Sequence, residues 1–195
     1  ETNDLVAFAF LFPPQSGLDK WYLKTMFFIP TVGAVVRETN KVPYLTWAGQ
    51  GFMTLCGEKR VDMTFIAQTV LNEMKRYTID FVAYDSWKSN IITEAFKQAG
   101  IDCRAIRQYY QQLSPASNMF AELIDTQQLE HDGNPVQTWC VGNVVIDRDP
   151  NGNIKPNKAK SSEKIDGVAA VIDALAGHQM QTEKKIITDC PIRFI

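Results

Sequence analysis

The sequence predicts an α/β domain in which a mixed sheet is flanked by helices, and three features of the chain predict it. Two long apolar segments near the start, residues 5–12 and 21–29, have the composition of paired strands. The middle of the chain alternates short apolar runs with segments of helical periodicity. A late amphipathic segment, residues 162–176, repeats its apolar residues at helical spacing.

The first two strands are predicted to form a hairpin. Strand 5–12 ends at Pro13-Pro14, and Gln15-Ser16-Gly17 supplies turn residues before strand 21–29. Residues 35–59 then contain the helix- and strand-breaking residues Pro43, Gly49, Gly51 and Gly57, and we expect an irregular insertion over one edge of the sheet.

Helices and short strands are predicted to alternate in the middle of the chain. Residues 62–77 have a helical pattern with Phe65, Ile66, Val70 and Met74 facing inward. The apolar run 81–84 is too short for a helix and indicates a buried strand. Residues 86–99 predict a helix closed by Gly100, and residues 101–106 predict a second short strand.

The remaining elements are predicted from Pro115 onward. Pro115 precedes a predicted helix over 117–126, and residues 139–147 fit either a strand or the extended end of a helix. Ser162 is the predicted N-cap of the last core helix. These patterns predict one domain over residues 1–178 and a polar tail over 179–195, with strand-like composition at its end, 191–195.

Two aspartates stand at positions where α/β proteins place chemistry. Asp85 ends the predicted strand 81–84, and ligands bind beyond the carboxyl ends of such strands. The alternative is that Asp85 only caps the next helix. Asp166 lies near the start of the last helix, where the helix dipole favours an acid. Gly167 beside it weakens a helix by about 1 kcal/mol relative to Ala, which suggests close approach by another group. Asp173 shares the helix face of Asp166, and we rank it below the other candidates.

Five short motifs follow one another along the chain, and their order carries more information than any one of them. They are Asp4-Leu5-x-Ala7; Ala83-Tyr84-Asp85-x-Trp87; His131-x-Gly133-Asn134-Pro135-x-x-x-Trp139-x-x-x-Asn143-Val144; Asp149-x-x-Gly152-Asn153-Ile154-Lys155-Pro156-x-Lys158; and Lys164-Ile165-Asp166-Gly167-x-Ala169. Together they resemble the C-terminal nuclease domain of the large terminase subunit of tailed bacteriophages. The resemblance extends over nearly the whole chain.

This resemblance implies a ribonuclease H-like fold and metal-dependent cutting of concatemeric double-stranded viral DNA during genome packaging. Two divalent cations, Mg²⁺ or Mn²⁺, would clamp the attacking and leaving oxygens of the phosphate. Hard cations prefer carboxylate oxygens, so Asp85, Asp166 and Asp4 are the implied catalytic residues and metal ligands. The resemblance also implies the terminase small subunit and the portal as partners, and the host cytoplasm as the location.

The chain departs from the family at its start. Family members usually carry a strand with a Gly-x-Asp-x-Ser pattern a few residues before the position of Asp4, and this sequence begins at Glu1. The resemblance therefore implies that the leading metal ligand lies outside these residues, and that Asp4 is an accessory acid. The family's ATPase motor is also not expected here, because no Gly-x-x-x-x-Gly-Lys-Ser/Thr motif occurs.

A basic stretch precedes Asp166. Lys155, Lys158 and Lys160 are the predicted contacts to the DNA backbone, since lysines near a metal site bind phosphates without reading sequence. The net charge of −2 gives no global sign of nucleic-acid binding, and by charge alone a solvated loop is the simpler explanation. We expect structural roles for His131 and for most of the tryptophans.

Other functional classes stay open at this point. A junction resolvase or transposase core shares the implied fold, and a non-catalytic fragment that only docks DNA or the portal is a further alternative. The four cysteines lack Cys-x-x-Cys spacing, which favours reduced thiols over zinc or disulfides. No apolar run reaches membrane-spanning length, and no signal peptide is visible.

Overall fold

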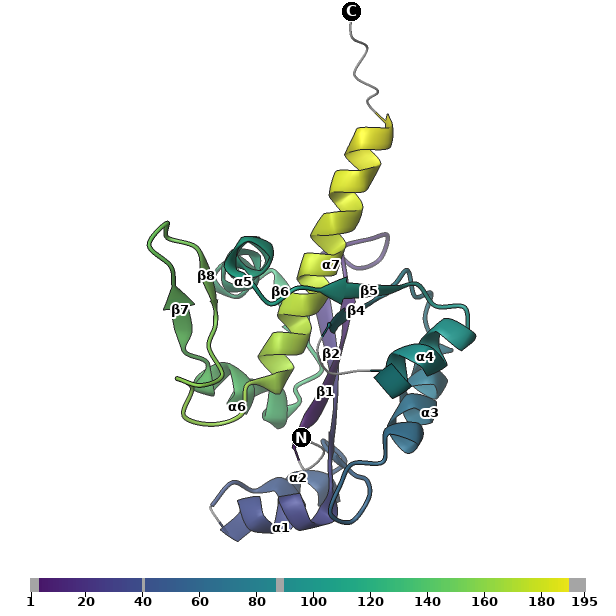
Figure 1. The fold of residues 1–195 in the computed structure, drawn as a ribbon, viewed down its shortest axis with the longest axis vertical. Coiled ribbons are helices and arrows are strands. Elements are labelled where there is room, and N and C mark those ends of the chain that lie inside the picture. Colours follow the sequence, from purple (N-terminus) through teal and green to yellow (C-terminus); the bar gives the residue numbers. More distant parts are fainter. Residues whose placement is uncertain (1–3, 40, 87–89, 190–195) are drawn as a thin grey trace, which may run out of the picture.

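The structure is a computed structural model that describes residues 4–39, 41–86 and 90–189. Strands β1 and β2 run through the middle of the molecule, with helices on both sides (Figure 1). Helices α3 (Met63–Met74) and α4 (Asn90–Gln98) lie on one side, and the long helix α7 (Asp166–Asp189) lies on the other. This arrangement confirms the predicted α/β class with helices flanking the sheet.

The N-terminal hairpin forms as the sequence predicts. Strand β1 (Val6–Phe12) pairs antiparallel with β2 (Trp21–Ile29), in a register that places Val6 opposite Phe28. The other edge of β2 pairs in parallel with two short strands, β3 (Thr54–Leu55) and β6 (Leu129–His131). The hairpin is therefore an integral part of a mixed sheet.

The alternation of side chains along β1 divides the core into two clusters. Val6, Phe8, Phe10 and Phe12 pack with residues of α3 and α4. The intervening residues, Leu5 to Leu11 in steps of two, pack on the opposite face with α5 (Tyr110–Asp125), α6 (Pro135–Asn143) and α7. Because successive strand residues point to opposite faces, a strand that is apolar throughout must be covered on both sides.

A second sheet lies beside the first. Strand β4 (Val82–Asp85) pairs in parallel with β5 (Cys103–Ile106), and α4 forms the connection between them. Gly100 has φ of +80° and follows the end of α4, so the predicted glycine closure of this helix is confirmed. A short hairpin of β7 (Ile146–Arg148) and β8 (Ile154–Pro156) projects near the start of α7 (Figure 1).

The prediction of an irregular insertion over residues 35–59 is wrong. These residues belong largely to α1 (Thr31–Thr39), α2 (Tyr44–Gly49) and β3. The buried side chains of Ala34 and Tyr44 hold the two helices against the core. The proline and glycines that suggested irregular structure instead lie at or near the ends of short elements. Packing against the core stabilises the helices between them.

Helices α3 and α5 also differ from prediction, in the burial of one residue and in the position of a proline. Phe65 in α3 is 43% exposed, since Ile66, Val70 and Met74 alone form the buried stripe among the four residues predicted to face inward. Pro115 lies inside α5 and does not precede a helix. Leu113 and Ala116 are both buried on either side of it, so the core holds the helix continuous despite the lost hydrogen bond.

The C-terminal third shows where cap signals were misread. Residues 139–147 divide between α6 and β7; Asn134 caps α6 by accepting a hydrogen bond from the Val136 amide, and Pro135 is its first residue. The last helix begins at Asp166, so Ser162 is not its N-cap. Helix α7 also continues through position 178 to Asp189.

The predicted strand 191–195 and the predicted helical residues 87–89 lie outside the described residues. None of the described helices is both long and apolar enough to cross a membrane.

Candidate active site

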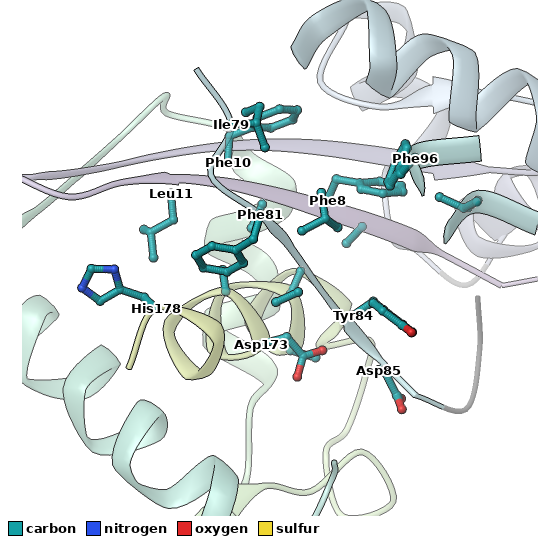
Figure 2. Close-up of a pocket in the computed structure, with 18 of the residues that line it drawn as sticks. Phe8, Phe10, Leu11, Ile79, Phe81, Tyr84, Asp85, Phe96, Asp173 and His178 are labelled. Carbon is teal, nitrogen blue, oxygen red and sulfur yellow. The ribbon is translucent and has the colours of Figure 1, made fainter. Parts of the chain in front are cut away.

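A large cavity of about 1170 Å³ lies between β1 and β4 (Figure 2). Every residue from Asp4 to Phe12 lines it, and so does every residue from Thr78 to Asp85. Consecutive strand residues point to opposite faces, so a cavity that touches all of them lies along the strand's edge. Among the described residues, no strand pairs with the second edge of β1 or of β4. The cavity is therefore a slot between two open strand edges.

The helices on both sides close this slot. On one side α7 contributes small residues, Ala169, Ala170 and Ala174. On the other side Met74, Ile92 and Phe96 supply larger apolar side chains from α3 and α4. The resulting environment is apolar along most of its length, which suits a covered strand better than a solvent channel.

Acidic residues gather at this slot. Asp4 precedes β1, Asp85 is the last residue of β4, Asp166 is the first residue of α7, and all three line the cavity. Asp173 lies seven residues further along α7, on the same helix face as Asp166, and it lines the cavity as well. Figure 2 shows its carboxylate on the same side of the pocket as Asp85. The structure thus brings the three predicted site residues to one cavity from distant parts of the chain.

Asp166 is paired with a lysine from the loop that follows β8. The Nζ atom of Lys158 lies 2.7 Å from Oδ1 of Asp166. Burial disfavours the ammonium, but Asp166, and further Asp85 and Asp173, raise the pKa of Lys158 above its usual value. Lys158 therefore remains charged and stands among three carboxylates.

Asp4 has a different partner. Its Oδ2 accepts from Nζ of Lys164 at 2.6 Å, and its Oδ1 accepts from the Leu5 amide at 2.8 Å. Burial opposes ionisation, yet the hydrogen bonds from Lys164 and Leu5 hold the pKa of Asp4 below its usual value. Asp4 is thus ionised and anchored to the segment just before α7.

Asp173 is the acidic residue to which the sequence gave too little weight. Its side chain is only 8% exposed, and Nε2 of Gln108 donates to its Oδ1 at 2.9 Å. Burial raises the pKa of Asp173 to about 7, and the nearby charge of Asp85 adds to this while Gln108 opposes it. The seven-residue spacing from Asp166 was the available signal, because it places both acids on one helix face.

Asp173→Asn is expected to stabilise the metal-free protein at pH 8 but not at pH 4. The native carboxyl keeps its proton up to about pH 7 whereas the unfolded one loses it near 4, so wild-type stability falls between these pH values. A shift of this size corresponds to at most about 4 kcal/mol. Urea unfolding in EDTA from pH 4 to 8 measures it, and a gap between the two proteins that does not widen with pH contradicts the expectation.

The donors in the slot suit a hard divalent cation in chemistry, but they do not form a complete site. Carboxylate oxygens are the preferred ligands of Mg²⁺ and Mn²⁺. Asp166 pairs with the positively charged ammonium of Lys158, so its environment already accommodates a positive charge. Within the described part of the chain, no three His, Cys, Asp or Glu side chains are arranged to hold a metal ion. At least one more ligand or a local rearrangement is needed.

The three lysines predicted to contact DNA are engaged within the protein. Lys155 Nζ donates to the Gln108 carbonyl at 3.0 Å and lies 4.7 Å from the centre of the Tyr110 ring. Lys160 pairs with Asp147, and together with hydrogen bonds from Tyr110 and Asn157 it lowers the pKa of Asp147 to about 2. These contacts fix the lysines near the β7–β8 hairpin; their role toward DNA stays a prediction.

The aromatic and histidine side chains considered above have structural contacts. Trp47 and Trp139 pack against each other and against the buried Tyr44 ring. Nδ1 of His131 accepts a hydrogen bond from the Gly133 amide at 3.1 Å, which stabilises the turn before α6. Trp87 lies outside the described residues.

Comparison with known proteins agrees with the motif order. The sequence model of the family described as "Terminase large subunit, endonuclease domain" matches residues 1–182. The large terminase subunit of Enterobacteria phage HK97 is 24% identical over 87% of this chain. Protein YmfN of Escherichia coli K12 is 28% identical over 71% of it. The chain spans about a third of the length of these relatives, 34% and 31% respectively.

The fold agrees as well. The crystal structure of the HK97 large terminase superimposes with a TM-score of 0.81 over 90% of this chain, at 23% identity, and the match spans 37% of that protein. The predicted ribonuclease H-like fold is therefore confirmed. By the family match over residues 1–182, the chain belongs to the endonuclease domain family of phage terminase large subunits.

Proposed function

We propose that this chain is the DNA-cutting part of a packaging enzyme, a metal-dependent endonuclease that cuts concatemeric double-stranded viral DNA. The observation that carries the proposal is the convergence of Asp4, Asp85 and Asp166 on one cavity. Clustered carboxylates repel one another, so a protein rarely keeps them together without a cation to hold. The family membership supports the reaction class, and the cluster of acids supports its location at the slot.

Two divalent ions, Mg²⁺ or Mn²⁺, would activate a water and stabilise the leaving oxygen when bound. In the protein, Asp85 and Asp166 serve as metal ligands from the end of β4 and the start of α7, with Asp4 as the accessory acid. Asp166 is the first residue of α7, so it lies at the positive end of the helix dipole. The helices around the slot keep solvent from its apolar length.

The slot itself is proposed to take a further strand. Both β1 and β4 present an unpaired edge to it, and unpaired backbone groups that are buried must find partners. A strand between them would join the two sheets into one. It would also place a further carboxylate beside Asp85 and Asp166, as the Gly-x-Asp-x-Ser strand of the family implies. Such a ligand would complete the site that three described acids leave open.

The test compares this chain with a longer protein that also carries the segment preceding Glu1. Cleavage of linear duplex DNA is measured with Mg²⁺, with Mn²⁺ and with EDTA. We expect metal-dependent cleavage by the longer protein, and amide exchange in β1 and β4 that is slower than in the 195-residue chain. Failure of the longer protein to cut with either metal would favour a non-catalytic docking role. Preferential cutting of branched DNA would favour a resolvase.

Double-stranded DNA is the proposed substrate, with the terminase small subunit and portal as partners in the host cytoplasm. Lys155 and Lys160 lie on or next to the β7–β8 hairpin, and Lys158, which lies between them in the sequence, pairs with Asp166. Phosphates held by these lysines would lie over the acidic end of the slot. Lysine contacts to phosphate carry no sequence information, so cleavage is expected to be weakly sequence-specific.

Lys155→Ala and Lys160→Ala are expected to weaken binding about equally on unrelated duplexes. Each lost phosphate contact is expected to lower the slope of log affinity against log salt by about one unit. Fluorescence anisotropy over a salt series measures both effects, with Lys97→Ala on the exposed face of α4 as the matched control. Unchanged affinity and slope in both variants would refute this DNA path and leave the metal site untouched.

A further inference from the structure

We propose that Lys158 competes with the divalent cation for Asp166, and that its ammonium holds the acidic end of the slot together while no metal is bound. The inference rests on the proposed function, because it assigns a role toward the metal to a residue of the same site. Lys158 is then a positioning residue in the metal-free protein and sets the metal affinity of the slot.

The contacts of Lys158 differ from those of the neighbouring lysines. Its Nζ atom lies 2.7 Å from Oδ1 of Asp166, and Lys158 itself lines the cavity. Asp85 and Asp173 also attract its charge. Lys160, by contrast, pairs with Asp147, which does not line the slot. Lys158 is thus a cation that faces Asp166 inside the slot, and Lys160 is a nearby lysine of the same loop that pairs outside it.

Competition follows from charge and space. An Asp166 oxygen that accepts from an ammonium at 2.7 Å does not offer that lone pair to a metal ion at the same time. A divalent cation that enters beside an ammonium also meets a like charge in a partly buried site, where repulsion is poorly screened. The ammonium therefore weakens the binding of a divalent cation at Asp166, and departure of Lys158 would free that Oδ1 lone pair for the metal. In the absence of metal, the same ammonium offsets repulsion among Asp85, Asp166 and Asp173.

The experiment titrates the longer protein, which carries the segment before Glu1 and the ligand proposed to complete the site, with MnCl₂ by calorimetry and measures its Tm in EDTA. Three variants are compared with wild type: Lys158→Gln, Lys158→Arg and Lys160→Gln. Glutamine still donates to Asp166 but carries no charge, so the fold is retained. We expect Lys158→Gln to bind Mn²⁺ about tenfold tighter or more and to have a lower Tm in EDTA. Lys158→Arg keeps the cation and Lys160→Gln leaves the slot unchanged, so both should bind Mn²⁺ within about twofold of wild type.

Equal or weaker Mn²⁺ binding by Lys158→Gln overturns the proposal, and so does the absence of binding by both wild type and Lys158→Gln. An equal gain in Lys160→Gln also overturns it, since the effect would then come from net charge alone. Tighter binding in Lys158→Gln supports the proposal even if the longer protein cuts no DNA, in which case only the nuclease assignment fails. Conversely, DNA cleavage with unchanged Mn²⁺ affinity leaves the nuclease assignment standing without this role for Lys158.

Discussion

Asp85→Asn and Asp166→Asn are each expected to abolish metal-dependent cleavage while leaving the fold intact. Both acids line the same cavity, at the end of β4 and at the start of α7. An amide has nearly the shape of a carboxylate but carries no charge, so a hard cation loses a ligand without a change in packing. A metal ion supplies several kcal/mol of charge stabilisation in the transition state. The loss of about 4 kcal/mol corresponds to a fall in rate of about three orders of magnitude.

The measurement is the initial rate of cutting of a linear duplex at saturating Mg²⁺ and Mn²⁺, in the longer protein that we propose to contain the additional strand. Circular dichroism and Tm in EDTA check that the variants fold. Asp125→Asn, at the exposed end of α5 and away from the slot, is the matched control and should cut like wild type. A variant at Asp85 or Asp166 that keeps more than about a tenth of the wild-type rate would show that this residue is not a metal ligand.

The hairpin of the sheet and the convergence of the acids are predicted from different kinds of sequence signal. The hairpin is predictable because β1 and β2 are long and apolar and are separated by turn residues, which are local signals. The meeting of Asp4, Asp85 and Asp166 is not local, since it depends on how β1, β4 and α7 pack. Only the motif order, through its resemblance to a known family, predicts it.

The elements that prediction missed are those stabilised by tertiary contacts. Helices α1 and α2 are short, and the burial of Ala34 and Tyr44 holds them in place. Pro115 is accommodated inside α5 because buried residues flank it. The pairing of Lys158 with Asp166 and the hydrogen bond from Gln108 to Asp173 likewise depend on three-dimensional proximity. Local sequence patterns contain no information about contacts between residues that are far apart in the chain.

Gly167→Ala is expected to destabilise the protein by about 1–3 kcal/mol, although alanine is the better helix former. The sequence suggested that Gly167 marks a close approach, and the structure identifies the partners. A Cβ atom at this position would lie 2.1 Å from Oε1 of Gln137 and 2.9 Å from Cζ of Phe27. Both side chains are buried, so either they must repack or the start of α7 must shift. A shift of α7 moves Asp166, and cleavage should then slow along with the loss of stability.

Gln137→Ala provides the internal test of this explanation. Within the part of the chain that the structure describes, neither Nε2 nor Oε1 of the buried Gln137 amide has a hydrogen-bond partner, so removing this side chain takes away the nearest clash and an unsatisfied polar group. In the Gln137→Ala background, Gly167→Ala should therefore cost clearly less than in wild type. Gly142→Ala in α6 is the control, because no atom of the described residues lies within 4 Å of its Cβ position, and it should stabilise by up to about 1 kcal/mol. Urea unfolding of the four proteins of the cycle measures the coupling. If Gly167→Ala is as well tolerated as Gly142→Ala, close packing is not the reason for glycine beside Asp166, and the contact between α6 and α7 does not position that carboxylate.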